Sequence, residues 1–303
     1  MNSKRLLYVA GPTASGKTAL AIALAQKFKT EIISCDSRQF YKEMTIGTAV
    51  PETNELSAVP HHFIQQRSIH EPYSVGAFQR EALAVLKRLF KTKDTVILVG
   101  GSGMYADALI EGLDVFPDVN PQIRIGLKEQ LEKEGLDKLA EKLKVLDPGY
   151  HQKVDLGNPQ RIIRALEVSI ANGLPYSSFL GNKKAPDFFT TKKIVIKWER
   201  QSLYDRINKR VDLMVDAGLE EEVRNLYTHR EINALQTVGY REWFSHFDGA
   251  FDRTTAIEEI KKNTRRYAKR QTTWFKRYTD AILVQGNSEI SSILKEFKPA
   301  SYP

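Results

Sequence analysis

Short apolar runs alternate with amphipathic stretches through the first third of the chain. The amphipathic stretches, at 17–28 and 78–93, have the spacing of helices that cover an apolar surface. The apolar runs contain few polar positions and predict three strands: RLLYVAG at 5–11, TEIISCDS at 30–37 and TVILVGG at 95–101. Such strands, separated by helices, are typical of a parallel sheet that is covered on both faces. We therefore expect an α/β fold with three layers.

The pattern of apolar and charged residues changes after the third predicted strand. Residues 122–146 are highly charged and predict helix, with a buried stripe formed by Leu127, Leu131, Leu139 and Leu143. A further helix is expected over 158–175, because Asn158 and Pro159 begin it and Gly173 and Pro175 close it. Together these segments predict a helical insertion rather than a continuation of the sheet.

The segment KIVIKWE at 193–199 has the apolar pattern of a core strand and predicts a return to the sheet. From Gln201 onward the chain is expected to be mainly helical. The predicted organisation is therefore a catalytic core formed by residues 1–115 and 190–303, with a helical insertion domain at 116–189.

Composition places the chain among ordinary globular proteins, with 42% hydrophobic and 27% charged residues. No apolar run approaches the roughly 20 residues of a membrane span, and the N-terminus has too few apolar residues for a signal peptide. The single cysteine, Cys35, excludes an internal disulfide and fits a reducing compartment. We expect a cytoplasmic protein without a membrane partner.

The net charge of +8 is concentrated in one segment. Residues 257–278 hold eight Lys or Arg and two Glu, a net +6, which leaves +2 for the rest of the chain. Helical spacing predicts that Ile257, Ile260, Tyr267 and Trp274 face the core, while another side of the helix carries Lys262, Arg266, Lys269 and Arg277. This basic side predicts contacts with a polyanion. The alternative is an ordinary solvated face.

The first predicted strand ends in GPTASGKT, a phosphate-binding loop (P-loop) with the Gly-x4-Gly-Lys-Thr pattern. In such a loop, backbone N–H groups and a helix N-terminus surround a phosphate, the lysine adds a positive charge and the threonine hydroxyl can hold Mg²⁺. The sheet is therefore expected to be P-loop NTPase-like. The phosphate-binding residues are Gly11, Pro12, Thr13, Ala14, Ser15, Gly16, Lys17 and Thr18.

The ligand of this loop is less obvious than its chemistry. A nucleotide hydrolase uses an acid at the end of a core strand to support Mg²⁺. The strand at 95–101 ends in glycines, and the obvious strand-end acid is Asp36. The P-loop, Asp36 and the Gly100–Gly103 turn all follow strands, so they should converge on one site. These residues alone do not decide between a small-molecule kinase and another phosphate-ester enzyme.

Several further segments together resemble the tRNA dimethylallyltransferase (isopentenyltransferase) family. They are GPTASGKTAL, DSRQFYKEMTIGTAVP, VPHHF, LVGGSGMYADALIEGL, NPQRIIRALEV, LYDRINKRVDLMVDAGLEEEV, LQTVGYREW and KRQTTWFKRY, in the family's order and spread over most of the chain. The combination of Asp36-Ser37-x-Gln39 with IGTA is the most specific part. Two positions depart from the family's usual pattern: Arg38 replaces an apolar residue, and Ser102 replaces a threonine.

The resemblance implies that the P-loop holds the diphosphate of dimethylallyl diphosphate rather than a nucleotide. It further implies transfer of the dimethylallyl group to the exocyclic N6 of adenosine 37 in tRNA. In that reaction Asp36 would accept the N6 proton as general base. Lys17, Mg²⁺ on Thr18, and Arg206 would stabilise the charge of the departing diphosphate.

The resemblance also implies a set of tRNA contacts, with the insertion clamping the anticodon stem-loop. Tyr240 is expected to stack on a base, and the target adenine is expected to flip out of its stack into the pocket. The expected tRNA-binding residues are Asp36, Ser37, Arg38, Gln39, Ser102, Arg124, Gln160, Arg161, Ile162, Ile163, Arg164, Gln236, Thr237, Val238, Gly239, Tyr240 and Arg241. His61 and His62 are interpreted as a structural turn, because no third metal ligand lies at a useful spacing.

Three other functions share part of this pattern. A small-molecule kinase has the P-loop and the strand-end acid but needs no basic helix. An adenylate isopentenyltransferase shares the motifs through Asp36 and acts on a free nucleotide. A P-loop RNA-binding module would bind tRNA without modifying it. We expect this protein to be a monomer.

Overall fold

The computed structural model describes residues 4–297. Its contacts divide the chain into two compact units. The larger unit combines the residues up to Ile110 with those from Pro186 onward, and the smaller unit is Glu111–Ala185. The smaller unit thus begins and ends a few residues earlier than the insertion range 116–189. Each unit has its own hydrophobic core.

The larger unit is built on a sheet of six parallel strands in the order β3-β2-β4-β1-β5-β6. The strands are β1 (Arg5–Ala10), β2 (Ile32–Ser34), β3 (His61–His62), β4 (Thr95–Gly100), β5 (Thr190–Lys197) and β6 (Ile282–Gln285). The predicted parallel α/β fold is confirmed, including the strand that returns after the insertion. The edge strands β3 and β6 are short and were not predicted.

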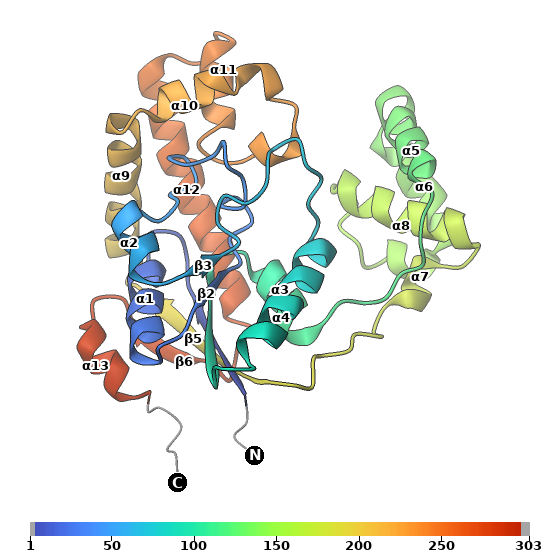
Figure 1. The fold of residues 1–303 in the computed structure, drawn as a ribbon. Coiled ribbons are helices and arrows are strands. Elements are labelled where there is room, and N and C mark those ends of the chain that lie inside the picture. The colour runs from blue at the N-terminus through green and yellow to red at the C-terminus, as the bar shows by residue number, and fades with distance from the viewer. Residues whose placement is uncertain (1–3, 298–303) are drawn as a thin grey trace. The chain divides into compact units, whose positions relative to one another are not determined.

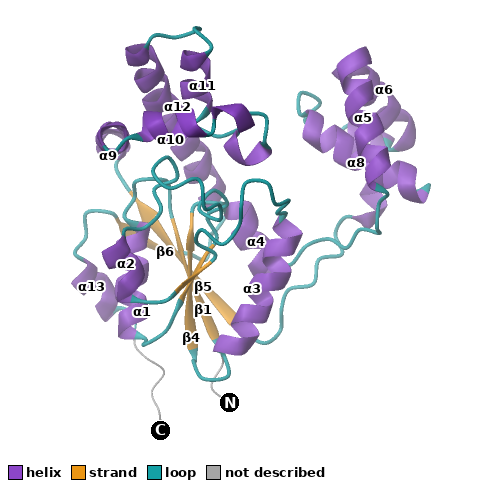
Figure 2. Ribbon diagram, turned by 45° about the horizontal axis from the view of Figure 1, so that its top comes forward, coloured by secondary structure: helices purple, strands orange, loops and turns teal. Residues whose placement is uncertain are grey.

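Helices cover both faces of the sheet, as Figure 2 shows with α1, α2 and α13 on one side and α3 and α4 on the other. On the first side, Leu20 and Leu24 of α1 pack with Leu7 and Val9 of β1. On the second side, Leu6 and Tyr8 face a larger cluster. These helices are α1 (Lys17–Lys27), α2 (Thr53–Ala58), α3 (Val75–Leu89), α4 (Gly103–Glu111) and α13 (Ile290–Lys295). The central strands β1 and β4 are almost wholly apolar because both of their faces are buried.

The C-terminal part of the larger unit is mainly helical, as expected. It contains α9 (Arg200–Asp216), α10 (Leu219–Asn225), α11 (Arg241–Phe247) and α12 (Arg253–Phe275), with short 3-10 turns η2 (Tyr227–His229) and η3 (Asn233–Leu235). The long helix α12 lies beside α9 (Figure 1). Along α12, Ile260 is buried, whereas Ile257, Tyr267 and Trp274 are only half-buried.

The smaller unit is a cluster of helices: α5 (Pro121–Glu134), α6 (Leu136–Leu146), α7 (Pro148–His151), α8 (Pro159–Asn172) and the 3-10 turn η1 (Tyr176–Phe179). Leu127, Leu139 and Leu143 are buried in its core as predicted, whereas Leu131 is only half-buried. The stretch 122–146 is two helices rather than one, because Gly135 adopts a φ of +84° between them. Among the described residues, every helix is too short or too polar to cross a bilayer.

Candidate active site

The P-loop joins β1 to α1 in the larger unit. Gly16 takes a left-handed conformation with φ of +89° and caps α1, which begins at Lys17. Ala14 is also left-handed, with φ of +62°. These turns place the loop across the N-terminus of α1, where unpaired N–H groups and the helix dipole favour an anion.

Three side chains from outside the loop hold its backbone: those of Gln271, Trp198 and Arg206. The Gln271 amide accepts a hydrogen bond from the Thr13 N–H (2.8 Å) and donates to the Gly101 carbonyl (2.9 Å). Trp198 Nε1 donates to the Ser15 carbonyl at 3.0 Å. Because Gln271 is 6% exposed and bridges the loop to the turn after β4, the P-loop is fixed from α12.

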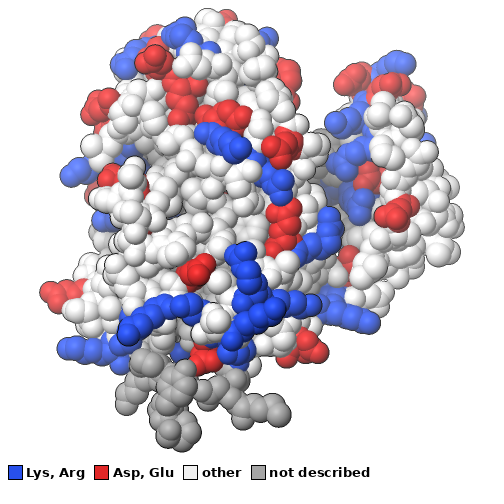
Figure 3. All heavy atoms as spheres, viewed as in Figure 1, with Lys and Arg blue, Asp and Glu red and all other residues white. Residues whose placement is uncertain are grey.

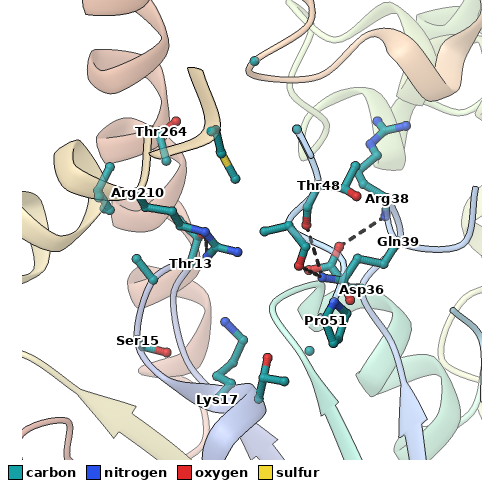
Figure 4. A pocket seen from close by; sticks show the side chains of 18 of the residues that line it. Thr13, Ser15, Lys17, Asp36, Arg38, Gln39, Thr48, Pro51, Arg210 and Thr264 are labelled. Atoms are coloured by element: carbon teal, nitrogen blue, oxygen red, sulfur yellow. Dashed lines mark hydrogen bonds between the residues drawn. The ribbon is translucent and has the colours of Figure 1, made fainter. Parts of the chain in front are cut away.

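Two cations on the loop side point into the pocket, Lys17 and Arg210 (Figure 4). Arg210 lies on α9 and donates to the Thr13 hydroxyl at 3.2 Å. Lys17 Nζ donates to the Pro12 carbonyl at 2.7 Å. Burial lowers the pKa of Lys17 from 10.5 to about 8, with Asp36 opposing this shift and Arg210 adding to it. Two cations that line the same cavity, neither of them in an ion pair with a carboxylate of residues 4–297, form a site for a multiply charged anion.

Arg206, the cation expected from the sequence, lies one turn before Arg210 on the same helix. Its Nε donates to the Ala14 carbonyl at 2.8 Å, and its guanidinium lies 4.4 Å from the centroid of the Trp198 ring. Arg206 thus also lines the pocket, but it contacts the loop's backbone. Arg210 was not predicted. The signal for it was the four-residue spacing from Arg206, which places both on one helix face.

The opposite wall of the pocket follows β2. Asp36, Gln39 and Thr48 lie there, facing the loop side (Figure 4). One Asp36 oxygen accepts the Arg38 N–H at 3.2 Å. The Gln39 amide donates to the Thr48 carbonyl at 3.2 Å and to the Ala49 carbonyl at 2.8 Å. The carboxylate therefore stands across the cavity from the cations, within a wall of backbone and amide groups.

The cavity between these walls measures about 560 Å³, a size suited to a small-molecule ligand. The P-loop, Asp36 and Gly100 line it together, so the predicted convergence at the carboxyl ends of the strands is confirmed. Of the expected site residues, the lining contains Thr13, Ala14, Ser15, Gly16, Lys17, Thr18, Asp36, Arg38, Gln39, Arg206, Thr237, Val238 and Gly239.

Some expected contacts of the larger unit lie outside that lining. Gly11 and Pro12, the first two residues of the loop, are buried. Ser37 and Ser102 bond each other through their hydroxyls at 3.1 Å, next to the cavity. Gln236 and Arg241 are exposed. Tyr240 is fully buried, so the expectation that its ring stacks on a base is wrong.

The smaller unit holds the other expected contacts. Gln160 and Arg161 are exposed at the start of α8. Ile162 and Ile163 are buried in the unit's core, so their side chains are unavailable to RNA, contrary to expectation. Arg124 and Arg164 both pair with the buried Glu167, which neutralises part of their charge.

The basic side of α12 divides into paired and unpaired cations. Lys262 pairs with Glu259, and Arg277, just beyond the helix, pairs with Asp107 at 3.0 Å. Within residues 4–297, Arg266 and Lys269 are exposed and have no carboxylate at ion-pair distance. On the face drawn in Figure 3, basic side chains also gather elsewhere, mixed with acidic ones. Lysine and arginine side chains are therefore not peculiar to α12. What sets this helix apart is its net positive charge.

The residues around the loop suit Mg²⁺ better than a metal with a full protein cage. The Thr18 hydroxyl and the Asp36 carboxylate supply oxygen groups to the same cavity. In the described part of the chain, no group of three or more His, Cys, Asp or Glu could hold a metal. Mg²⁺ commonly takes one or two protein oxygens together with substrate phosphates and water. The histidines of β3 have other partners: His61 contacts the Val59 carbonyl, and His62 contacts Glu31.

Comparison with known protein families shows to which family this chain belongs. The family model described as IPP transferase matches residues 39–278. The chain belongs to this family. The resemblance seen in the sequence is thereby confirmed, and the P-loop NTPase-like fold agrees with it.

Curated relatives within the IPP transferase family are similar over almost their whole length. The tRNA dimethylallyltransferase of Flavobacterium johnsoniae is 55% identical over 280 residues, covering 90% of this chain and 91% of the relative. That of Christiangramia forsetii is 56% identical over 275 residues, covering 91% of each.

Solved structures of the family agree with the fold. The tRNA isopentenylpyrophosphate transferase of Bacillus halodurans is 34% identical, with a TM-score of 0.72 and coverage of 97% of this chain and 94% of that one. A eukaryotic dimethylallyltransferase acting on tRNA is 26% identical, with a TM-score of 0.80 and coverage of 95% and 75%. Both units of the chain are thus accounted for by the family.

Proposed function

We propose that this protein is a tRNA dimethylallyltransferase, which transfers the dimethylallyl group of dimethylallyl diphosphate to N6 of adenosine 37 in tRNA. Membership of the IPP transferase family and the similarity to named tRNA dimethylallyltransferases support this function. The observation that carries it is that cations and a carboxylate face each other from opposite walls of one cavity. Lys17 and Arg210 line the P-loop side, and Asp36 stands opposite.

The chemistry fits this arrangement. The adenine N6 is a poor nucleophile because its lone pair is delocalised into the ring, so the donor must ionise substantially. The bond between C1 of the donor and the diphosphate oxygen breaks, and its electron pair leaves with diphosphate. The N6–C1 bond forms, and the proton from N6 passes to the Asp36 carboxylate. Diphosphate and the N6-substituted adenosine are the products.

Charge on the departing diphosphate is stabilised by groups that are already in place. Lys17 and Arg210 face it, and Arg206 keeps the loop backbone in position through the Ala14 carbonyl. The Thr18 hydroxyl would hold Mg²⁺, which when bound would neutralise further negative charge on the phosphate oxygens. Preorganised charge of this kind is usually the largest single contribution to catalysis.

The tRNA is held by both units in this proposal. The target adenine leaves its stack and enters the cavity beside Asp36 and Gln39. In the smaller unit, Gln160 and Arg161 are the exposed residues best suited to grip the anticodon stem-loop. We further propose that the enzyme works in the cytoplasm as a monomer.

A four-substrate assay tests this function. The protein is incubated with labelled dimethylallyl diphosphate and a mixture of unmodified tRNA, AMP and ATP, and nucleosides are separated and identified by mass spectrometry. Label should appear only in tRNA, as N6-dimethylallyladenosine at position 37. Label on AMP or ATP would identify an adenylate isopentenyltransferase, turnover of ATP would indicate a kinase, and binding of tRNA without label would indicate an RNA-binding module.

The pKa of Lys17 predicts a pH dependence of donor binding. An ammonium with a pKa near 8 binds diphosphate below that pH and loses its charge above it. We expect the dissociation constant of dimethylallyl diphosphate to rise by up to about tenfold per pH unit above pH 8. Isothermal titration calorimetry across that range measures it. Lys17→Met should lack the rise, and a constant affinity in the native protein would contradict the prediction.

The unpaired cations of α12 predict a salt dependence of tRNA binding. Each phosphate contact contributes about 0.9 to the slope of log K against log salt concentration. Arg266→Gln combined with Lys269→Gln should reduce that slope by roughly 1–2. Lys262→Gln is the matched control, because Lys262 already pairs with Glu259. An unchanged slope in the double variant would remove this side of α12 from the RNA interface.

A further inference from the structure

One carboxylate, which lies outside the cavity, fixes a backbone segment that forms part of the cavity wall. Glu222 lies on α10 and accepts hydrogen bonds from three consecutive backbone N–H groups, those of residues 45–47. The distances are 3.0 Å from Thr45, 2.7 Å from Ile46 and 3.0 Å from Gly47. The same carboxylate accepts a fourth bond from the Tyr240 hydroxyl at 2.6 Å. Four donors on two oxygens leave this group well satisfied.

The packing around these bonds admits little variation. Tyr240 is fully buried, and a Cβ on Gly47 would approach its ring to 2.6 Å. Only a glycine therefore lets the backbone at residue 47 come this close to the tyrosine. Neither Glu222 nor Tyr240 lines the cavity, so both act from behind the segment that they hold.

The held segment, residues 45–49, reaches the site through Gln39. We call it the acceptor segment. Gly47, Thr48 and Ala49 line the cavity. The Thr48 and Ala49 carbonyls receive both bonds from the Gln39 amide, and Gln39 lies three residues after Asp36. The chain of contacts therefore runs from Glu222 through the acceptor segment to Gln39 on the wall that carries Asp36.

The P-loop wall is held by different groups. Gln271, Trp198 and Arg206 fix its backbone. Within residues 4–297, Glu222 bonds none of them, since its partners are the three N–H groups and Tyr240. A change at Glu222 should consequently affect one wall of the cavity and spare the other.

We propose that Glu222 is a positioning residue for the acceptor: it fixes residues 45–49 and, through them, the Gln39 amide, so that the incoming adenine is held beside Asp36. This inference depends on the proposed function, because it assigns the Asp36 wall to the purine and the P-loop wall to the donor. It predicts an effect on the tRNA substrate that is separate from donor binding.

The test is Glu222→Gln, with the two substrates measured separately. Each carboxylate oxygen accepts two donors, so an amide in either orientation presents its NH₂ to two donors that it cannot satisfy. We expect kcat/KM for tRNA to fall by about 10–100-fold, mainly through KM, while the dissociation constant of dimethylallyl diphosphate stays within about twofold. Glu221→Gln is the matched control, because Glu221 is the exposed neighbour with the same charge.

A second, milder variant keeps the proposal testable if Glu222→Gln fails to fold. Tyr240→Phe removes one of the four donors and keeps the ring, so the same separation should appear with a smaller effect, of a few-fold in KM for tRNA. Equal losses for both substrates, or no loss for either in both variants, would overturn the proposal. Failure of the native protein to label tRNA would overturn the proposed function instead, so the two failures are distinguishable.

Discussion

Replacing Asp36 with asparagine should slow transfer by a factor of about 10²–10⁴ while leaving the donor bound. Asparagine keeps the size and the acceptor oxygen of the side chain that receives the Arg38 N–H, but it cannot take a proton from N6. Single-turnover experiments with enzyme in excess over tRNA measure the chemical step directly. Donor affinity, measured by calorimetry without tRNA, should change by less than a few-fold.

Asp205→Asn is the control for this prediction. Asp205 is exposed on α9 and, within the part of the chain that the structure describes, bonds only Gln201, so the same loss of charge there should leave the rate unchanged. If Asp36→Asn transferred the prenyl group at the native rate, Asp36 would not be the base.

Replacing Arg210 with glutamine should lower kcat/KM by about 10²–10³, equivalent to roughly 3–4 kcal/mol of transition-state stabilisation. Arg210 faces the cavity beside Lys17 and, among the residues that the structure describes, bonds only the Thr13 hydroxyl of the loop. Its remaining donors are therefore available to the phosphate oxygens. Steady-state kinetics with dimethylallyl diphosphate as the varied substrate measure the loss.

Arg206→Gln is the matched comparison, one helical turn away. Its guanidinium is already engaged by the Ala14 carbonyl and the Trp198 ring, so we expect a loss of less than about tenfold. A larger loss for Arg206→Gln than for Arg210→Gln would reverse the roles that we give to the two arginines.

The parts of this site that follow strands could be predicted from the sequence. An apolar run, a glycine-rich turn and an amphipathic helix occur together in the chain, so the P-loop and its place in the sheet are local features. Asp36 follows β2 in the same way. Because the strands are parallel, their carboxyl ends meet at one edge, and local pattern therefore fixes which residues converge.

Side chains that approach the site from distant helices could not be predicted so well. The α9 pattern does not distinguish Arg206 from Arg210, because which of the two reaches the Thr13 hydroxyl depends on how the helix is rotated against the loop. Glu222 is one of three consecutive glutamates, and its neighbours differ entirely: Glu220 pairs with Arg224 and Arg253, and Glu221 is exposed.

Two expectations failed because a motif says nothing about burial. Tyr240 lies in a segment expected to contact RNA, yet its ring fills the space left by Gly47 and its hydroxyl bonds Glu222. Ile162 and Ile163 belong to another such segment, and both side chains are buried in the core of the smaller unit. In each case, burial of the apolar part of the side chain stabilises the fold.

The most direct test of the account is a crystal structure of the complex with tRNA and an unreactive thio analogue of dimethylallyl diphosphate. We predict the two phosphates at the P-loop, in contact with Lys17 and Arg210, and the N6 of a flipped adenine within hydrogen-bond reach of Asp36. A diphosphate bound elsewhere, or an adenine turned away from that carboxylate, would contradict the account.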